Sequence, residues 1–235
     1  MIKKENNLSN IKLLLELIIV LGIVFSLKYF CLQYFFIGAG SIGIWGGIIS
    51  ATIILRKRST SWGDLGLRLP KGGKQWIFQL GLSLIALVLM ALVQVLTLKV
   101  LTPTFGLSGA GDVMDHFRLF SGKPIHFTLY IVVGIWIGAG LGEELLIRGF
   151  ILNHLKEALG NSRLSWTLAI IGQAVIFGSM HGYQGSVGIV ATGLTGLSFG
   201  ILYIATNRKL FPLIVAHNVF NTLFLFAAYA TGEAG

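Results

Sequence analysis

The sequence predicts an all-α fold, a polytopic transmembrane helix bundle of about seven spans. Hydrophobic residues make up 54% of the 235 residues and charged residues 11%, whereas a typical soluble domain has about 25% charged residues. Several apolar runs are long enough to cross a bilayer, and a few ionisable side chains lie inside them. This combination excludes an ordinary soluble enzyme, a disordered protein and a coiled coil.

Each predicted span is an apolar run close to the roughly 20 residues that a helix needs to cross a hydrocarbon core about 30 Å thick. The runs cover approximately residues 12–36, 37–55, 76–101, 127–152, 164–180, 187–206 and 210–230. They are too long and too uniformly apolar for barrel strands, so we expect helices, whose backbone groups pair internally. No small-residue cleavage site follows the first run, which predicts a retained helix rather than a signal peptide.

The spans are expected to form a single integral membrane domain with two regions. Residues 1–126 hold three spans and a basic cytoplasmic loop, and residues 127–235 hold the other four spans. Positive residues favour the cytoplasmic side of a membrane protein. With the N-terminus in the cytoplasm, that side carries Lys3, Lys4, Lys12, Arg56, Lys57, Arg58, Arg68, Lys71, Lys74, Lys156, Arg163, Arg208 and Lys209. The opposite side carries Lys28, Lys99, Arg118 and Lys123. We therefore expect a multi-pass protein of the cell membrane with its N-terminus inside and its C-terminus outside.

The net charge of +9 is best explained by membrane lipid. The basic residues form short clusters between apolar runs, a pattern that fits loops beside anionic head groups better than a nucleic-acid-binding face. We expect membrane lipid as a partner and no nucleic acid, and the oligomeric state stays open. The single cysteine, Cys31, excludes an intramolecular disulfide and a multi-cysteine zinc site.

Ionisable side chains inside a span are costly, so each one is a functional candidate. The fourth run holds Glu143, Glu144 and Arg148. Glu144 and Arg148 are four residues apart and are expected to pair on one helix face, because either would be costly alone in an apolar setting. Glu143 lies about 100° around the helix and has no local cation, which makes it a candidate general base. The alternative is that these side chains only brace neighbouring helices.

Two further spans carry polar residues at helical spacing. The fifth ends with Phe177 and His181, which are four residues apart and share a face. The seventh contains His217 and Asn221 at the same spacing. An imidazole and an amide on one face can both donate hydrogen bonds to one oxyanion. An interfacial histidine and an interhelical hydrogen bond are the structural alternatives.

Together the three sites supply a carboxylate, two imidazoles and an amide. These groups can activate a water molecule and stabilise a tetrahedral oxyanion, which is the chemistry of amide hydrolysis. The chain has no G-x-S-x-G nucleophile elbow and no H-E-x-x-H zinc motif. The sequence therefore predicts hydrolysis by a set of residues on separate helices.

These motifs resemble those of the CPBP family of intramembrane proteases, which includes the type II CAAX prenyl endopeptidases and their bacterial relatives. The motifs are E-E-x-x-x-R from Glu143 to Arg148, F-x-x-x-H from Phe177 to His181, and H-x-x-x-N from His217 to Asn221. Their order and spacing match over about residues 127–229, and residues 62–70 are similar to the family's linker. The resemblance implies an all-helical bundle that encloses an intramembrane polar cavity, with residues 127–235 as the catalytic core. The implied roles are water activation by Glu143 and His181, oxyanion binding by His217 and Asn221, and orientation of the site by Glu144 and Arg148.

The resemblance leaves two mechanisms open. Family members have been called metalloproteases, and the same residues can serve as a glutamate protease without metal. A zinc site would take Glu143, His181 and His217, and so would remove His217 from the oxyanion role. The fifth and seventh spans hold no carboxylate to orient either imidazole, as metal-bound histidines usually require. We therefore expect no cofactor, with a divalent metal such as zinc as the alternative.

The predicted function is an intramembrane endopeptidase that cuts a membrane-associated peptide or protein, with lipidated substrates included. A non-enzymatic membrane immunity or scaffold protein on the same helices is the alternative, and a small transporter with an ion relay is a third. The intact motifs favour the protease, and the absence of repeated halves counts against the transporter. Bacteriocin-related and peptide-maturation roles fit as well as a prenylated substrate does.

The depths of the polar residues differ when they are counted along ideal helices. Glu143 and His181 lie about 25 Å from the loop near Gly160, whereas His217 lies about 12 Å beyond residues 208–209, at a rise of about 1.5 Å per residue. Helix tilt, or a break in the fourth helix near residues 138–142, would bring the three to one level.

Overall fold

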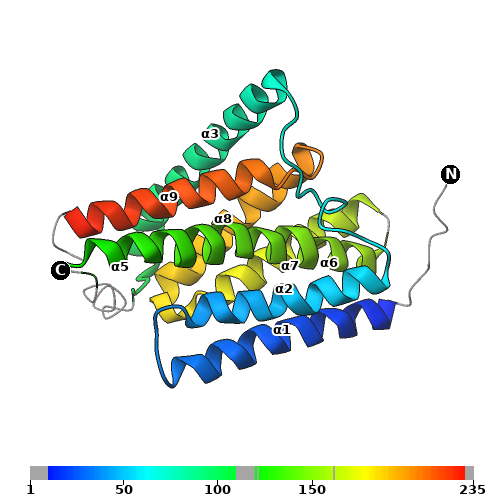
Figure 1. Ribbon diagram of the computed structural model, residues 1–235, viewed down its shortest axis with the longest axis horizontal. Helices are drawn as coiled ribbons and strands as arrows, with labels where there is room; N and C mark the ends of the chain where they lie inside the picture. The colour runs from blue at the N-terminus through cyan, green and yellow to red at the C-terminus, as the bar shows by residue number, and fades with distance from the viewer. Residues whose placement is uncertain (1–9, 110–119, 121, 161, 231–235) are drawn as a thin grey trace.

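The computed structural model describes residues 10–109, 120, 122–160 and 162–230. These residues form an all-helical bundle, which confirms the predicted fold class (Figure 1). Lys3, Lys4 and Arg118, which entered the orientation argument, lie outside the described residues.

The helical elements of the described residues follow one another along the chain as labelled in Figure 1. In chain order the elements are α1 (Asn10–Leu32), α2 (Ala39–Lys57), α3 (Gly73–Leu96), η1 (Thr97–Leu101), α4 (Thr102–Phe105), α5 (Pro124–Leu129), η3 (Tyr130–Ile151), α6 (Leu152–Leu159), α7 (Arg163–Ser179), η4 (Gly182–Gln184), α8 (Gly185–Ala205) and α9 (Phe211–Ala230). One long helix at the centre of the bundle, Pro124–Leu159, runs without interruption through α5, η3 and α6 (Figure 1). Its middle element, η3, is π-helical. Such winding is uncommon and is frequently found at functional sites.

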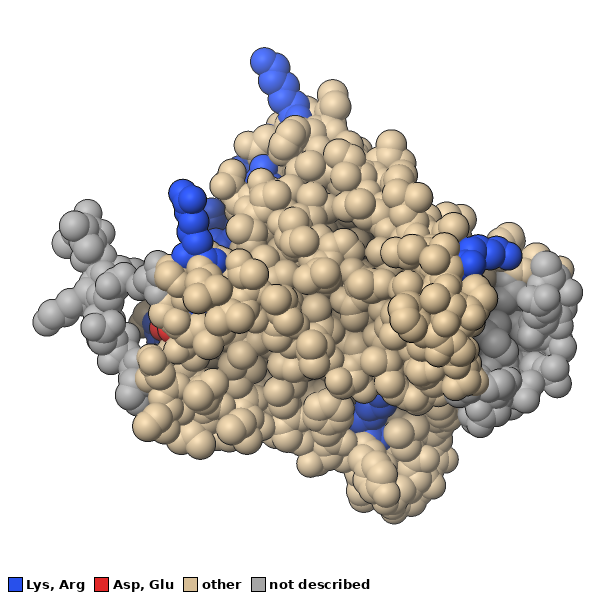
Figure 2. All heavy atoms as spheres, turned by 180° about the vertical axis from the view of Figure 1, so that it is seen from behind, with Lys and Arg blue, Asp and Glu red and all other residues tan. Residues whose placement is uncertain are grey.

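Five helical segments within the described residues are long and apolar enough to cross a membrane, and they correspond to the first four and the sixth predicted spans. Their bounds are Asn10–Leu32, Ala39–Lys57, Gly73–Phe105, Pro124–Leu159 and Gly182–Ala205. The helices of the fifth and seventh predicted spans are shorter: α7 has 17 residues, and the apolar part of α9 is Phe211–Ala227. Figure 2 shows a face whose surface is mostly neither basic nor acidic, with Lys and Arg in a few small clusters, as suits contact with lipid. The chain is a multi-pass membrane protein.

Glycines allow close packing of the helices that carry the polar residues. A Cβ at Gly43 of α2 would lie 2.6 Å from the carbonyl oxygen of Val24 in α1. A Cβ at Gly142 of η3 would lie 2.8 Å from Cγ2 of Ile44 in α2. Small residues therefore bring α1, α2 and η3 together, as they commonly do between membrane helices.

Residues 58–72, which link α2 to α3, pack on the turn ahead of α9. The hydroxyl of Tyr203 donates to the carbonyl oxygen of Leu65 at 2.7 Å, and the Leu210 amide donates to that of Gly66 at 3.1 Å. Gly66 has φ +99°, and a Cβ there would lie 1.8 Å from the carbonyl oxygen of Arg208. Only glycine fits this close approach, so the linker is fixed over the start of α9.

The structure settles how His217 reaches the level of Glu143. The fourth helix is unbroken at residues 138–142, so the break that the depths suggested is not present. Instead, α9 begins well inside the end of the bundle that α6 and α7 reach (Figure 1). Residues 208–209 therefore lie deeper in the bundle than the loop near Gly160, and this difference brings His217 to the level of Glu143.

Candidate active site

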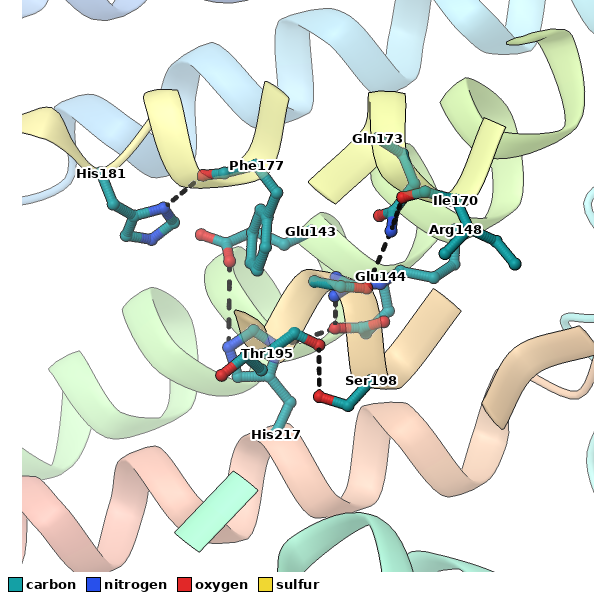
Figure 3. Close-up of polar contacts among 11 residues, drawn as sticks. Glu143, Glu144, Arg148, Ile170, Gln173, Phe177, His181, Thr195, Ser198 and His217 are labelled. Atoms are coloured by element: carbon teal, nitrogen blue, oxygen red, sulfur yellow. Dashed lines mark hydrogen bonds and ion pairs between the residues drawn. The ribbon is translucent and has the colours of Figure 1, made fainter. Parts of the chain in front are cut away.

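A buried ion pair on η3 forms the floor of the site. Nη1 of Arg148 donates to Oε1 of Glu144 at 3.0 Å, and both side chains are 0% exposed. The pair has the predicted i, i+4 spacing. Nδ1 of His217, on α9, donates to the same Glu144 oxygen at 2.9 Å (Figure 3). A carboxylate only accepts hydrogen bonds, so Nδ1 carries a proton and Nε2 faces away from Glu144.

Two phenylalanines enclose the guanidinium of Arg148. Its Cζ lies 4.6 Å from the ring centroid of Phe177 on α7 and 5.3 Å from that of Phe199 on α8. Both rings also lie edge-on to His217, with centroids 6.4 Å apart. Cation–π contacts are strongest where water is excluded. Phe177 therefore ties the fifth predicted span to Arg148 of the fourth.

Glu143 occupies the side of η3 that faces the open space of the site. Its side chain is 15% exposed, and Oε2 lies 3.8 Å from Nε2 of His217. His217 thus stands between two successive glutamates, with Nδ1 on the buried Glu144 and Nε2 toward Glu143.

His181 follows α7, and a hydrogen bond to a backbone carbonyl one turn earlier in the chain fixes its imidazole. Its Nδ1 donates to the carbonyl oxygen of Phe177 at 2.9 Å, so the neutral ring keeps Nε2 free of a proton as an acceptor (Figure 3). No hydrogen bond or ion pair joins His181 to Glu143 in the described part of the chain; the closer imidazole to Glu143 is that of His217. Glu143 and His181 can therefore cooperate only through a molecule placed between them.

A cavity of about 470 Å³ brings the predicted residues together. Glu143, His181, His217 and Asn221 all line it, and Glu144 and Arg148 lie buried behind its wall. Residues from α1, α2 and α3 also contribute to the lining. The site is therefore built from both regions that the sequence predicted.

Three residues near the site were missed from the sequence. Lys28 and Tyr183 line the cavity, and Asn218 is buried beside His217. A Cβ at Gly140 would lie 1.9 Å from Oδ1 of Asn218, so that glycine makes room for the amide. The available signal for Lys28 was its position inside the first apolar run, where an ionisable side chain is a functional candidate.

The donors that zinc would need do not fit a metal site in this arrangement. Within the described ranges, no group of three or more His, Cys, Asp and Glu side chains could hold a metal ion. No orienting carboxylate was expected for either imidazole, because the fifth and seventh spans contain none, but His217 has one. Glu144, from the fourth, orients the His217 imidazole.

The fold and the site define a multi-pass membrane protein with a Glu–His–Arg cluster beside a cavity between its helices. Residues 125–223 match the family model described as type II CAAX prenyl endopeptidase Rce1-like. The match contains all six predicted site residues, and it confirms the family resemblance on which their roles were based. The match supports a CAAX-type intramembrane protease. No curated protein and no solved structure matches the chain.

Proposed function

We propose that the chain is an intramembrane endopeptidase that hydrolyses a peptide bond in a membrane-associated peptide or protein, lipidated substrates included. One observation carries the proposal: Glu143, His181, His217 and Asn221 line one cavity. Its volume, about 470 Å³, lies within the usual ligand-pocket range of about 300–1,000 Å³. A carboxylate, two imidazoles and an amide around such a space can activate water and bind an oxyanion.

Glu143 is the proposed general base. It takes a proton from a water molecule held between its carboxylate and the acceptor Nε2 of His181. The hydroxide forms a bond to the carbonyl carbon of the substrate, and the carbonyl π electrons move to the oxygen. The C–N bond then breaks, and Glu143 returns the proton to the leaving amine. Transfer by a positioned acid or base of this kind contributes about 10²–10⁴-fold to a rate.

Asn221 and His217 are the proposed donors to the oxyanion. They lie one turn apart on α9, and both line the cavity. The amide of Asn221 can donate without any change of protonation. His217 donates from Nε2 only when its ring holds a second proton, because Glu144 holds the first on Nδ1. Glu144 and Arg148 thus act on the site through His217.

The experiment that tests this function compares membranes containing the wild-type protein with membranes containing Glu143→Gln. New peptide N-termini are labelled and identified by mass spectrometry. The proposal expects cleavage products from membrane-associated substrates with the wild-type protein alone. Identical sets of N-termini in the two samples would favour a non-enzymatic immunity or scaffold role.

Activity is expected to persist after the purified protein is dialysed against a strong chelator. Among the described residues no group of three or more His, Cys, Asp and Glu side chains could hold a metal ion, and the amide of Asn221 is a poor zinc ligand but a good hydrogen-bond donor. The measurement is the hydrolysis rate before and after dialysis, together with the zinc content. Stoichiometric zinc, with activity lost on chelation and restored by zinc, would establish the metalloprotease mechanism instead.

Cysteines placed at Ser61 and Gly235 are expected to react with an impermeant reagent from opposite sides of the membrane. The distribution of Lys and Arg puts residue 61 inside and the C-terminus, which lies outside the described residues, on the other side. Cys31 is buried and is replaced by alanine to remove background labelling. Labelling of both sites from the same side would contradict the proposed orientation.

A further inference from the structure

Lys28 brings a positive charge from α1 to the cavity wall. It lies within the first apolar run and outside residues 125–223, which match the protease family. The side chain lines the same cavity as Glu143 and His181. Burying an ammonium group is costly unless its hydrogen bonds are satisfied, so its contacts indicate what it does there.

Lys28 contacts residues on both sides of His181 in the sequence. Nζ of Lys28 donates to the carbonyl oxygen of Met180 at 2.8 Å, across 152 residues of sequence. The same Nζ lies 4.5 Å from the ring centroid of Tyr183. The ring of Tyr183 also lies 5.8 Å from that of His181. Lys28 therefore fixes the residue before His181 and an aromatic ring just after it.

The position of Met180 explains why a cation suits this place. Helix α7 ends at Ser179, and the last carbonyls of a helix have no partner within it. A positive charge near that end is also favoured by the helix dipole. The ammonium of Lys28 provides both the donor and the charge, from a different helix.

Close packing of α1 on α2 sets where Lys28 can reach. A Cβ at Gly43 of α2 would lie 3.1 Å from Cβ of Lys28 and 2.6 Å from the carbonyl oxygen of Val24. Glycine at residue 43 therefore lets the two backbones approach at the turn that carries Lys28. The N-terminal helices thus place one defined group in the site.

We propose that Lys28 is a positioning residue for His181: by binding the Met180 carbonyl and the Tyr183 ring, it holds the turn after α7 so that the His181 imidazole faces Glu143 across the cavity. This inference rests on the proposed protease function. Lys28 acts through His181, and the N-terminal region thereby takes part in catalysis. A displacement of a catalytic group by about 1 Å can cost about 10²-fold in rate, which sets the expected effect.

The test compares Lys28→Met and Lys28→Arg with the wild-type protein in steady-state hydrolysis. We expect Lys28→Met to lower kcat about 10²-fold, with KM changed less than about twofold, since substrate binding is not its role. Lys28→Arg keeps a donor and a cation and should recover most of kcat. Lys99→Met, at an exposed lysine of η1, is the matched control and should behave as wild type.

A second readout does not depend on turnover. The NMR signal of the His181 ring, in protein labelled at histidine and assigned by its loss in His181→Gln, should shift in Lys28→Met and return toward its original position in Lys28→Arg. If Lys28→Met does not fold, Tyr183→Leu, which removes the ring contact, should shift the same signal more than Tyr183→Phe does.

The outcomes separate the two proposals. Wild-type activity in Lys28→Met, an arginine variant no better than the methionine variant, or an unchanged His181 signal would overturn the role of Lys28. An inactive wild-type protein would overturn the protease function, and the NMR signal would still decide whether Lys28 positions His181.

Discussion

Glu143→Gln is expected to lower kcat for peptide hydrolysis by about 10²–10⁴-fold, the contribution of a positioned general base. The amide has nearly the same volume as the carboxylate but cannot accept the proton from water. Glu143 lines the cavity, lies 3.8 Å from His217 and is not a member of the buried Glu144–Arg148 pair, so its replacement leaves that pair intact. Steady-state kinetics on the purified variant measures the loss.

A thermal unfolding curve is the control for that variant. Glu143→Gln should unfold within a few degrees of the wild-type protein, because it removes no packed group. Hydrolysis at the wild-type rate by the folded variant would rule out Glu143 as the base and direct attention to His181.

Arg148→Met is expected to destabilise the protein by about 3–5 kcal/mol and to abolish activity, because it leaves a buried charge without its partner. Arg148 and Glu144 are both 0% exposed, and the guanidinium also packs between Phe177 and Phe199. With Arg148 gone, His217 is the remaining side-chain hydrogen-bond partner of Glu144 among the described residues. Thermal or denaturant unfolding in detergent measures the stability, and kinetics measures the activity.

The double variant Glu144→Gln/Arg148→Met separates the two effects. It removes both charges, so it should be clearly more stable than Arg148→Met alone. It should remain inactive, since His217 loses the carboxylate that holds its Nδ1 proton. If Arg148→Met alone is as stable as the wild-type protein, the Glu144–Arg148 ion pair does not stabilise the fold.

The local features of the site could be predicted because they depend on the spacing along one helix. Glu144 and Arg148 pair at i, i+4, as the sequence indicates. The membrane spans could be predicted from apolar run length, although α7, with 17 residues, and the apolar part of α9, Phe211–Ala227, are shorter than the other spans. The family resemblance in turn singled out six residues, and the match over residues 125–223 contains them all.

Contacts between distant segments could not be predicted in this way. His217 reaches Glu144 across 73 residues, and nothing in the spacing of either motif indicates that the second glutamate, and not the first, holds its Nδ1. Counting along ideal helices misplaced His217 because it treated the turn before α9 as level with the loop near Gly160. That turn packs against residues 58–72, where Gly66 accepts a hydrogen bond from the Leu210 amide and lies close to the Arg208 carbonyl. Lys28 was counted among the positive residues on the outer side, and its sequence position did not indicate that its ammonium binds the Met180 carbonyl beside the cavity.

Peptide cleavage by the purified protein in lipid nanodiscs, followed by mass spectrometry, tests the proposed protease function most directly. The substrate is a membrane-associated peptide identified from the comparison of N-termini. We predict cleavage at a defined bond by the wild-type protein, unchanged by a chelator and absent with Glu143→Gln. An intact peptide after incubation with folded wild-type protein, or equal cleavage by both proteins, would contradict it.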